Sequence, residues 1–133
     1  MIEIKKITDE ALAQRLCLEN GLEWADDYKV IATLDGKDAL NLAVFTYDGE
    51  EGRILAIAGF EDDIFMLDGL CRAILNIMDI NGVKQVYLSD KYEKLAKYVG
   101  FSKENDDFVL KLEGFFECKC GKKGDEKINE FKG

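Results

Sequence analysis

The chain has 133 residues, of which 47% are hydrophobic and 34% are charged. This length suffices to bury one hydrophobic core, and the composition is too polar for a membrane protein. The sequence has no histidine, which excludes a Ser-His-Asp triad, a Cys-His nucleophile pair and a histidine-ligated metal. Its 18 Lys and Arg residues against 27 Asp and Glu residues give a net charge of −9. Because this sign repels a phosphate backbone, we expect no nucleic-acid partner.

The sequence carries no pattern typical of export or membrane insertion. Its first residues lack the apolar run of a signal peptide, and apolar stretches such as residues 54–59 are far shorter than the roughly 20 residues that span a bilayer. Four cysteines in an acidic, lysine-rich chain are expected to stay reduced. We therefore expect a cytoplasmic protein that does not contact a membrane.

The first half of the chain predicts an antiparallel meander with one helix. The expected elements are a strand at 2–7, a helix at 9–20 and strands at 29–34, 40–47 and 53–60. Asp35-Gly36 is a hairpin signal between two of these strands. Because the strand at 53–60 is apolar on both faces, we expect it to be central in the sheet and covered on each side.

The second half predicts a βαβ unit and a closing hairpin. The expected elements are a hydrophobic helix at 65–80, a strand at 83–89, a helix at 91–99 and strands at 101–104 and 108–112. A helical connection of this length implies a right-handed crossover between parallel strands. The fold class is therefore α/β (α+β), with a mixed sheet in a domain at 1–113 and a Cys-, Lys- and Gly-containing tail at 114–133.

This order of elements is similar to that of the GNAT N-acetyltransferase superfamily. Residues 81–88 resemble the end of the family's central helix and its following strand, and Gly100-Phe101 resembles the corner after the family's last helix. The resemblance spans most of residues 1–113. It implies a GNAT-like fold, acetyl-CoA as cofactor and N-acyltransferase activity.

The chain departs from the family at the loop that holds the diphosphate of acyl-CoA. The family motif R/Q-x-x-G-x-G/A falls on residues 62–67, where Asp62 replaces the basic residue and Phe65 and Leu67 replace the glycines. Glycines let backbone N–H groups approach phosphates, and acids at this point can cap the helix themselves. The candidate contacts to acyl-CoA are Ala56, Ile57 and Gly59 on the preceding strand and Phe65, Met66 and Leu67 at the start of the helix.

The family's catalytic acid is also replaced. Many members use a tyrosine four residues before the Gly-Phe corner, a position that holds Ala96 in this chain. Tyr98 lies two residues further along the helix and so points about 200° away, and Tyr92 does not inherit the role by spacing either. The remaining catalytic candidates are Tyr98 as an acid and Glu61 or Asp62 as a base acting on an amine through water.

The four cysteines form two groups. Cys17 and Cys71 lie in the apolar stripes of helices, where we expect them to be core residues. Cys118 and Cys120 lie in the tail and resemble the first half of the SecA-type C-terminal zinc motif. Since structural zinc takes four ligands, zinc would need a Cys118/Cys120 site shared within a homodimer. A surface redox pair and two incidental thiols are the other interpretations.

Two functions remain open after these observations. The first is a divergent GNAT-like protein with a degenerate acyl-CoA site, which acts as a binding or regulatory module with a protein partner. The alternative is an active acyl-CoA-dependent N-acetyltransferase with a remodelled site. Such an enzyme would act on a small cationic amine, since the net charge of −9 attracts cations.

Overall fold

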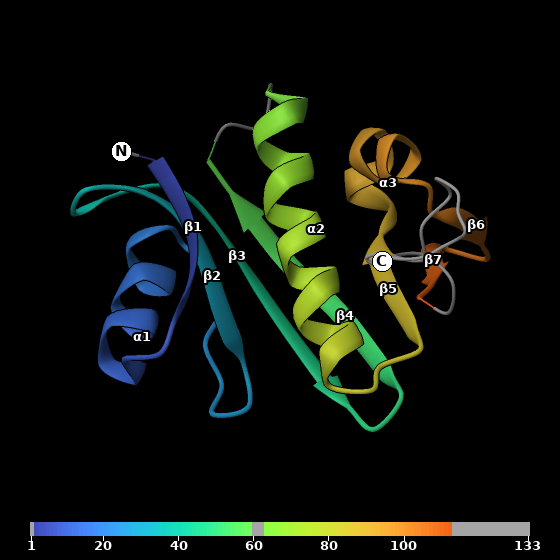
Figure 1. The fold of residues 1–133 in the computed structure, drawn as a ribbon, viewed down its shortest axis with the longest axis horizontal. Helices are drawn as coiled ribbons and strands as arrows, with labels where there is room; N and C mark the ends of the chain where they lie inside the picture. The colour runs from blue at the N-terminus through green and yellow to red at the C-terminus, as the bar shows by residue number, and fades with distance from the viewer. Residues whose placement is uncertain (1, 60–62, 113–133) are drawn as a thin grey trace, which may run out of the picture.

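The computed structural model describes residues 2–59 and 63–112, which form one mixed sheet with helices on both faces (Figure 1). The elements are β1 (Ile2–Ile7), α1 (Glu10–Glu19), β2 (Lys29–Asp35), β3 (Asp38–Asp48), β4 (Glu51–Ala58), α2 (Ile64–Ile80), β5 (Gln85–Ser89), η1 (Asp90–Tyr92), α3 (Glu93–Val99), β6 (Ser102–Glu104) and β7 (Asp107–Lys111). Within these residues the sheet has seven strands in the order β1-β2-β3-β4-β5-β7-β6.

The topology confirms the predicted meander, crossover and closing hairpin. Neighbouring strands are antiparallel except for β4 and β5, which are parallel and joined through α2. The closing hairpin turns back on the sheet, so β7 lies next to β5 and β6 forms the edge. β4 is therefore the central strand, as expected.

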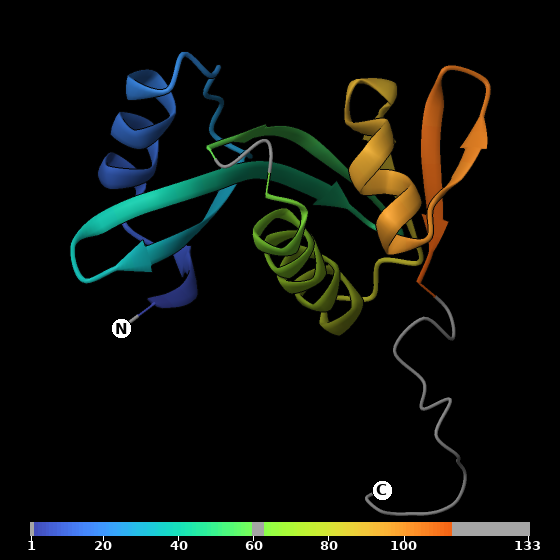
Figure 2. The ribbon, with the colours of Figure 1, turned by 90° about the horizontal axis from the view of Figure 1, so that it is seen from above.

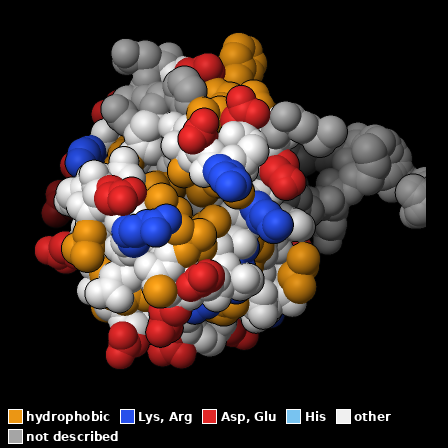
Figure 3. Space-filling model, turned by 90° about the vertical axis from the view of Figure 1, so that its left-hand side faces the viewer, with side chains coloured by type: hydrophobic (Ala, Val, Ile, Leu, Met, Phe, Trp, Pro, Cys, Tyr) orange, Lys and Arg blue, Asp and Glu red, His pale blue; other side chains and the backbone are white. Residues whose placement is uncertain are grey.

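Two hydrophobic clusters hold the helices on opposite faces of the sheet. The larger cluster lies between the sheet and α2 and α3, and the smaller one lies between α1 and strands β2 and β3. Figure 2 shows α1 and α2 on either side of the sheet. Figure 3 looks at the left-hand end of the view in Figure 1, where β1 and α1 lie, and acidic, basic and hydrophobic side chains are mixed over the visible surface.

The expectation that β4 is covered on each side is wrong for part of the strand. Ile54 and Ile57 are buried beneath α2, but Arg53 on the opposite face is exposed, and Leu55 and Ala56 are half-buried. The reason is the position of α1, which packs over β2 and β3 and reaches only Leu55 of β4.

Capping residues fix both ends of α2. The Asp63 side chain accepts a hydrogen bond from the Met66 N–H at 3.2 Å, and the helix ends at Asn81-Gly82. Gly82 has φ +86°, and the N–H of Val83 returns to the carbonyl of Met78 at 2.9 Å, which is a Schellman ending. The predicted helix at 65–80 therefore differs from the observed one by a single residue. No helix in the described ranges is long and apolar enough to cross a membrane.

The helix predicted at 91–99 begins differently. Its first turn is the 3₁₀ turn η1, in which the Ser89 hydroxyl accepts from the Lys91 N–H at 3.2 Å, and α3 starts only at Glu93. Gly100 ends α3 with φ +118°, and Phe101 is buried. This short turn between β5 and α3 decides where Tyr92 lies.

Candidate functional site

β4 parts from β5 halfway along its length. Within the described residues, the ladder between them runs from Glu51–Gln85 to Ile54–Leu88, while β4 continues to Ala58. On its other side, β4 pairs Ile54 with Phe45 and Ala56 with Val44, so Leu55 is the extra residue of a β-bulge. Because β5 separates from β4 after Ile54 and β4 bulges at Leu55, the edge of β4 beyond Ile54 faces α3 instead of a neighbouring strand.

Tyr92 reaches this edge of β4. The Ile57 N–H donates a hydrogen bond to the Tyr92 hydroxyl at 3.0 Å, across 35 residues of sequence. The Tyr92 ring is half-buried and packs against the larger hydrophobic cluster. Ile57, which the sequence predicted as a contact to acyl-CoA, therefore has its N–H already paired with Tyr92. The spacing of residues along the chain gave no reason to expect this role for Tyr92.

A mostly apolar cavity of about 200 Å³ lies beside this contact, between β4, the start of α2 and α3. Its lining is Ile57, Ile64, Leu67, Lys91, Tyr92, Lys94 and Leu95. The fold thus brings together Ile57 and Leu67, two of the predicted acyl-CoA contacts from separate elements.

Asp63 bonds two N–H groups at the start of α2. The Asp63 carboxylate bonds the Met66 N–H, and the Asp63 carbonyl accepts from the Leu67 N–H at 3.1 Å. Leu67 is buried in the core, whereas the Phe65 side chain is 75% exposed. The expectation that an acid caps this helix is confirmed for Asp63, while Glu61 and Asp62 lie outside the described residues.

Ala96 and Tyr98, the two positions considered for a catalytic acid, lie in different environments. Ala96 is fully buried in the larger cluster. Tyr98 is 46% exposed, and its ring meets that of Phe65 edge-on, with centroids 6.1 Å apart. Since Tyr98 is not among the described residues that line the cavity at Ile57, the structure brings Tyr98 and Phe65 together but not Tyr98 and β4.

Gly59 has a packing role at the end of β4. Its φ is +90°, and a Cβ there would lie 2.7 Å from the Leu40 carbonyl oxygen and 2.9 Å from the Asn41 Cα. Asn41 and Thr33, which face each other on β3 and β2, are buried, and their side-chain polar atoms have no hydrogen-bond partner among the described residues. Glycine lets β4 approach Asn41 this closely. Ala56, by contrast, pairs with Val44 and lies on the α1 side of the sheet.

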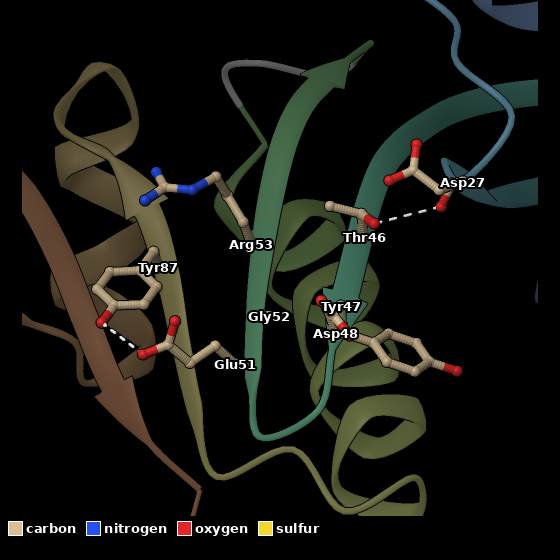
Figure 4. Close-up of a pocket in the computed structure, with 8 residues that line it drawn as sticks. All are labelled: Asp27, Thr46, Tyr47, Asp48, Glu51, Gly52, Arg53 and Tyr87. Atoms are coloured by element: carbon tan, nitrogen blue, oxygen red, sulfur yellow. Dashed lines mark hydrogen bonds between the residues drawn. The ribbon is translucent and has the colours of Figure 1, made fainter.

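A polar cavity of about 290 Å³ opens on the face of the sheet opposite α2 (Figure 4). It is lined by Asp27, Thr46, Tyr47, Asp48, Glu51, Gly52, Arg53 and Tyr87. The Arg53 guanidinium lies over the Tyr87 ring and pairs with Asp107 at 3.2 Å, and the Tyr87 hydroxyl donates to Glu51 at 3.5 Å. No sequence motif indicated this cavity, because strand register alone makes Thr46, Arg53 and Tyr87 neighbours.

The structure confirms Cys17 and Cys71 as core residues. Both side chains are buried, and burial raises the pKa of each thiol, that of Cys71 to about 12. Neither therefore forms a reactive thiolate near neutral pH. In the part of the chain that the structure describes, no three Cys, Asp or Glu side chains are grouped so that they could hold a metal. Cys118 and Cys120 lie outside the described residues.

The central sheet, its parting strands and the crossover helix match the GNAT fold. Similar solved structures are an N-acetyltransferase from Staphylococcus aureus Mu50, with a TM-score of 0.68, 14% identity and coverage of 85% of this chain and 99% of that one, and the ribosomal-protein-S18-alanine N-acetyltransferase from Escherichia coli, with a TM-score of 0.64, 14% identity and coverage of 84% and 94%. A third is YhhK from E. coli, solved bound to coenzyme A, with a TM-score of 0.62, 16% identity and coverage of 84% and 98%.

At these identities the similarity establishes the fold alone. No protein-family model matches the sequence, and no curated protein is significantly similar to it.

Proposed function

We propose that this GNAT-like domain has a degenerate acyl-CoA site and acts as a binding or regulatory module. The observation that carries the proposal is the start of α2, where the Asp63 carboxylate already bonds the Met66 N–H. A diphosphate at a helix start needs N–H groups that it can approach, together with favourable charge. Here a carboxylate accepts from one of these N–H groups, and side chains at Phe65 and Leu67 stand where the resemblance places glycines.

The part of the site expected to hold the pantetheine arm of acyl-CoA also has its N–H group already bonded. The resemblance places the pantetheine arm of acyl-CoA along Ala56 to Gly59, but the Ile57 N–H on that strand bonds Tyr92. YhhK was solved with coenzyme A bound, so the fold itself can host this cofactor. The residues of this chain do not fit it in that position, and the proposed module carries out no acyl transfer.

The surroundings of α3 also support a module without acyltransferase chemistry. Proton transfer needs a donor within hydrogen-bond reach of the leaving group. Ala96 offers no such group, and Tyr98 packs against Phe65 at the surface. The Tyr92 hydroxyl does lie at β4, but there it accepts from the Ile57 N–H on which the resemblance places the pantetheine arm. Such a module would act through a binding partner, and we propose that this partner is a protein.

The alternative, an N-acetyltransferase acting on a cationic amine, draws support from the polar cavity. Its carboxylates at Asp27, Asp48 and Glu51 favour a cation. However, the β3 partners of Arg53 and Ile57, Thr46 and Ala43, are three residues apart, which puts this cavity about 10 Å along the strand from the Tyr92 contact. A cation bound in the cavity would lie too far from that contact for direct acyl transfer.

Isothermal titration of the protein with acetyl-CoA tests the proposal, with YhhK titrated in parallel as a protein that binds coenzyme A. We expect no saturable binding to this chain. A second assay follows release of the coenzyme A thiol in the presence of polyamines, aminoglycosides and peptides with free N-termini, and we expect none. A low-micromolar Kd, or thiol release with any of these amines, would overturn the proposal.

A further inference from the structure

The edge of β4 beyond its last pair with β5 is suited to bind an extended chain. An unpaired strand edge offers backbone N–H and C=O groups, on which an extended ligand lies as an additional strand would. The ladder with β5 ends at Ile54, and the Ile57 N–H points away from β3 toward η1 and α3. In this chain the Tyr92 hydroxyl accepts from that N–H.

Tyr92 is held at this position by local structure and by packing. Ser89 begins the 3₁₀ turn through its bond with the Lys91 N–H, and Tyr92 is the last residue of the turn. Its ring contacts the larger hydrophobic cluster, and the Lys91 ammonium lies 5.6 Å from the ring centroid. The ring also forms one wall of the apolar cavity next to Ile57. An incoming chain would therefore have to displace both the hydrogen bond and the ring.

We propose that Tyr92 is a specificity-determining residue that excludes an extended amide chain, such as pantetheine, from the β4 edge. A ligand amide carbonyl would gain from Ile57 only the hydrogen bond that Tyr92 already makes, and it would lose the packing of the ring. Removal of the ring would join the β4 edge to the existing cavity of about 200 Å³. The inference rests on the proposed function, in which the intact chain does not bind acyl-CoA. The inference about Tyr92 applies to the pantetheine arm of acyl-CoA, whereas the argument from the start of α2 applies to its diphosphate.

Pantetheine is the probe that isolates Tyr92, because it lacks the diphosphate. The ¹⁵N-labelled protein is titrated with pantetheine while the amide resonances of β4 are followed, for the unaltered chain, Tyr92→Ala, Tyr92→Phe and the matched control Tyr98→Ala. We expect Tyr92→Ala to bind at least about tenfold tighter than the unaltered chain, roughly the value of one well-made hydrogen bond. Tyr98→Ala, which removes an exposed ring from the helix that follows Tyr92, and Tyr92→Phe, which keeps the ring, should both bind as the unaltered chain does.

A second measurement covers the case in which Tyr92→Ala does not fold. In Tyr92→Phe, the Ile57 amide should exchange with deuterium at least about tenfold faster than in the unaltered chain, since its acceptor is gone. Unchanged exchange in Tyr92→Phe, or a folded Tyr92→Ala that gains no affinity for pantetheine, would overturn the inference. Acetyl-CoA binding to the unaltered chain would contradict the proposed function instead, so the two failures are distinguishable.

Discussion

Gly59 and Gly49 both adopt positive φ angles, but their surroundings differ. Gly49, in the turn between β3 and β4, has φ +63°, and a Cβ at this position would have nothing within 4 Å. Gly59 has φ +90°, and its Cβ would meet the backbone of Leu40 and Asn41 at under 3.0 Å. A methyl group at Gly59 therefore brings both an unfavourable backbone angle and a collision with backbone that cannot rotate away.

We predict that Gly59→Ala lowers the free energy of unfolding by about 3 kcal/mol, as the sum of the dihedral and collision costs. Gly49→Ala should lose only about 1 kcal/mol, because it carries the dihedral cost alone. Urea denaturation followed by circular dichroism measures both. Equal losses in the two variants would contradict the packing role of Gly59.

At this scale the sequence could place the core residues but not the contact between Ile57 and Tyr92. Cys17 and Cys71 are predicted to be buried because helical spacing alone fixes their face. The bond from Ile57 to Tyr92 joins residues 35 apart, and it depends on how far β5 runs before its turn begins. A tyrosine three residues after the turn-starting Ser89 is the only local signal.

Helix ends are the most predictable feature at the scale of elements. Asn81-Gly82 and Gly100 end α2 and α3 as expected, because few residues other than glycine accept the positive φ that these endings need. The bulge at Leu55 is not predictable in this way, since it arises from the pairing of β4 with β3 and leaves no turn residue in the sequence. The 3₁₀ turn before α3 likewise has the sequence pattern of ordinary helix.

The N-cap of α2 gives a direct test at this scale. We predict that Asp63→Ala destabilises the protein by about 1 kcal/mol, because the Met66 N–H loses its partner, and that Asp63→Asn retains most of the stability. Asp9 caps α1 in the same way, through the Leu12 N–H at 3.2 Å, so Asp9→Ala is the matched control with a similar expected loss. Thermal or urea unfolding measures all three variants. An Asp63→Ala variant as stable as the unaltered chain would contradict the assigned cap.

For the whole molecule, the sheet is buried most deeply at its centre and least at its edges. Strand β3 has five consecutive buried residues, Asn41 to Phe45. Strand β1, which in the described part of the chain pairs with β2 alone, leaves most of its side chains exposed, with Ile2 at 57%. The larger cluster joins α2 and α3 to the central strands, while only the smaller cluster lies under α1. Stability should therefore decrease from the β3–β4 centre toward β1.

Hydrogen exchange of the native protein tests this gradient. Amides of β1 that are bonded to β2 should exchange through local opening, with a free energy about 2–3 kcal/mol below that of amides in β3, which open only when the larger cluster breaks. The short edge strand β6, whose residues are all exposed, serves as the internal comparison and should behave as β1 does. The comparison uses only amides that face a neighbouring strand, since the outward-facing amides of an edge strand exchange without any opening. If the inward-facing β1 amides exchanged as slowly as those of β3, the N-terminal strand would belong to the same cooperative unit as the central sheet, contrary to the division into two clusters.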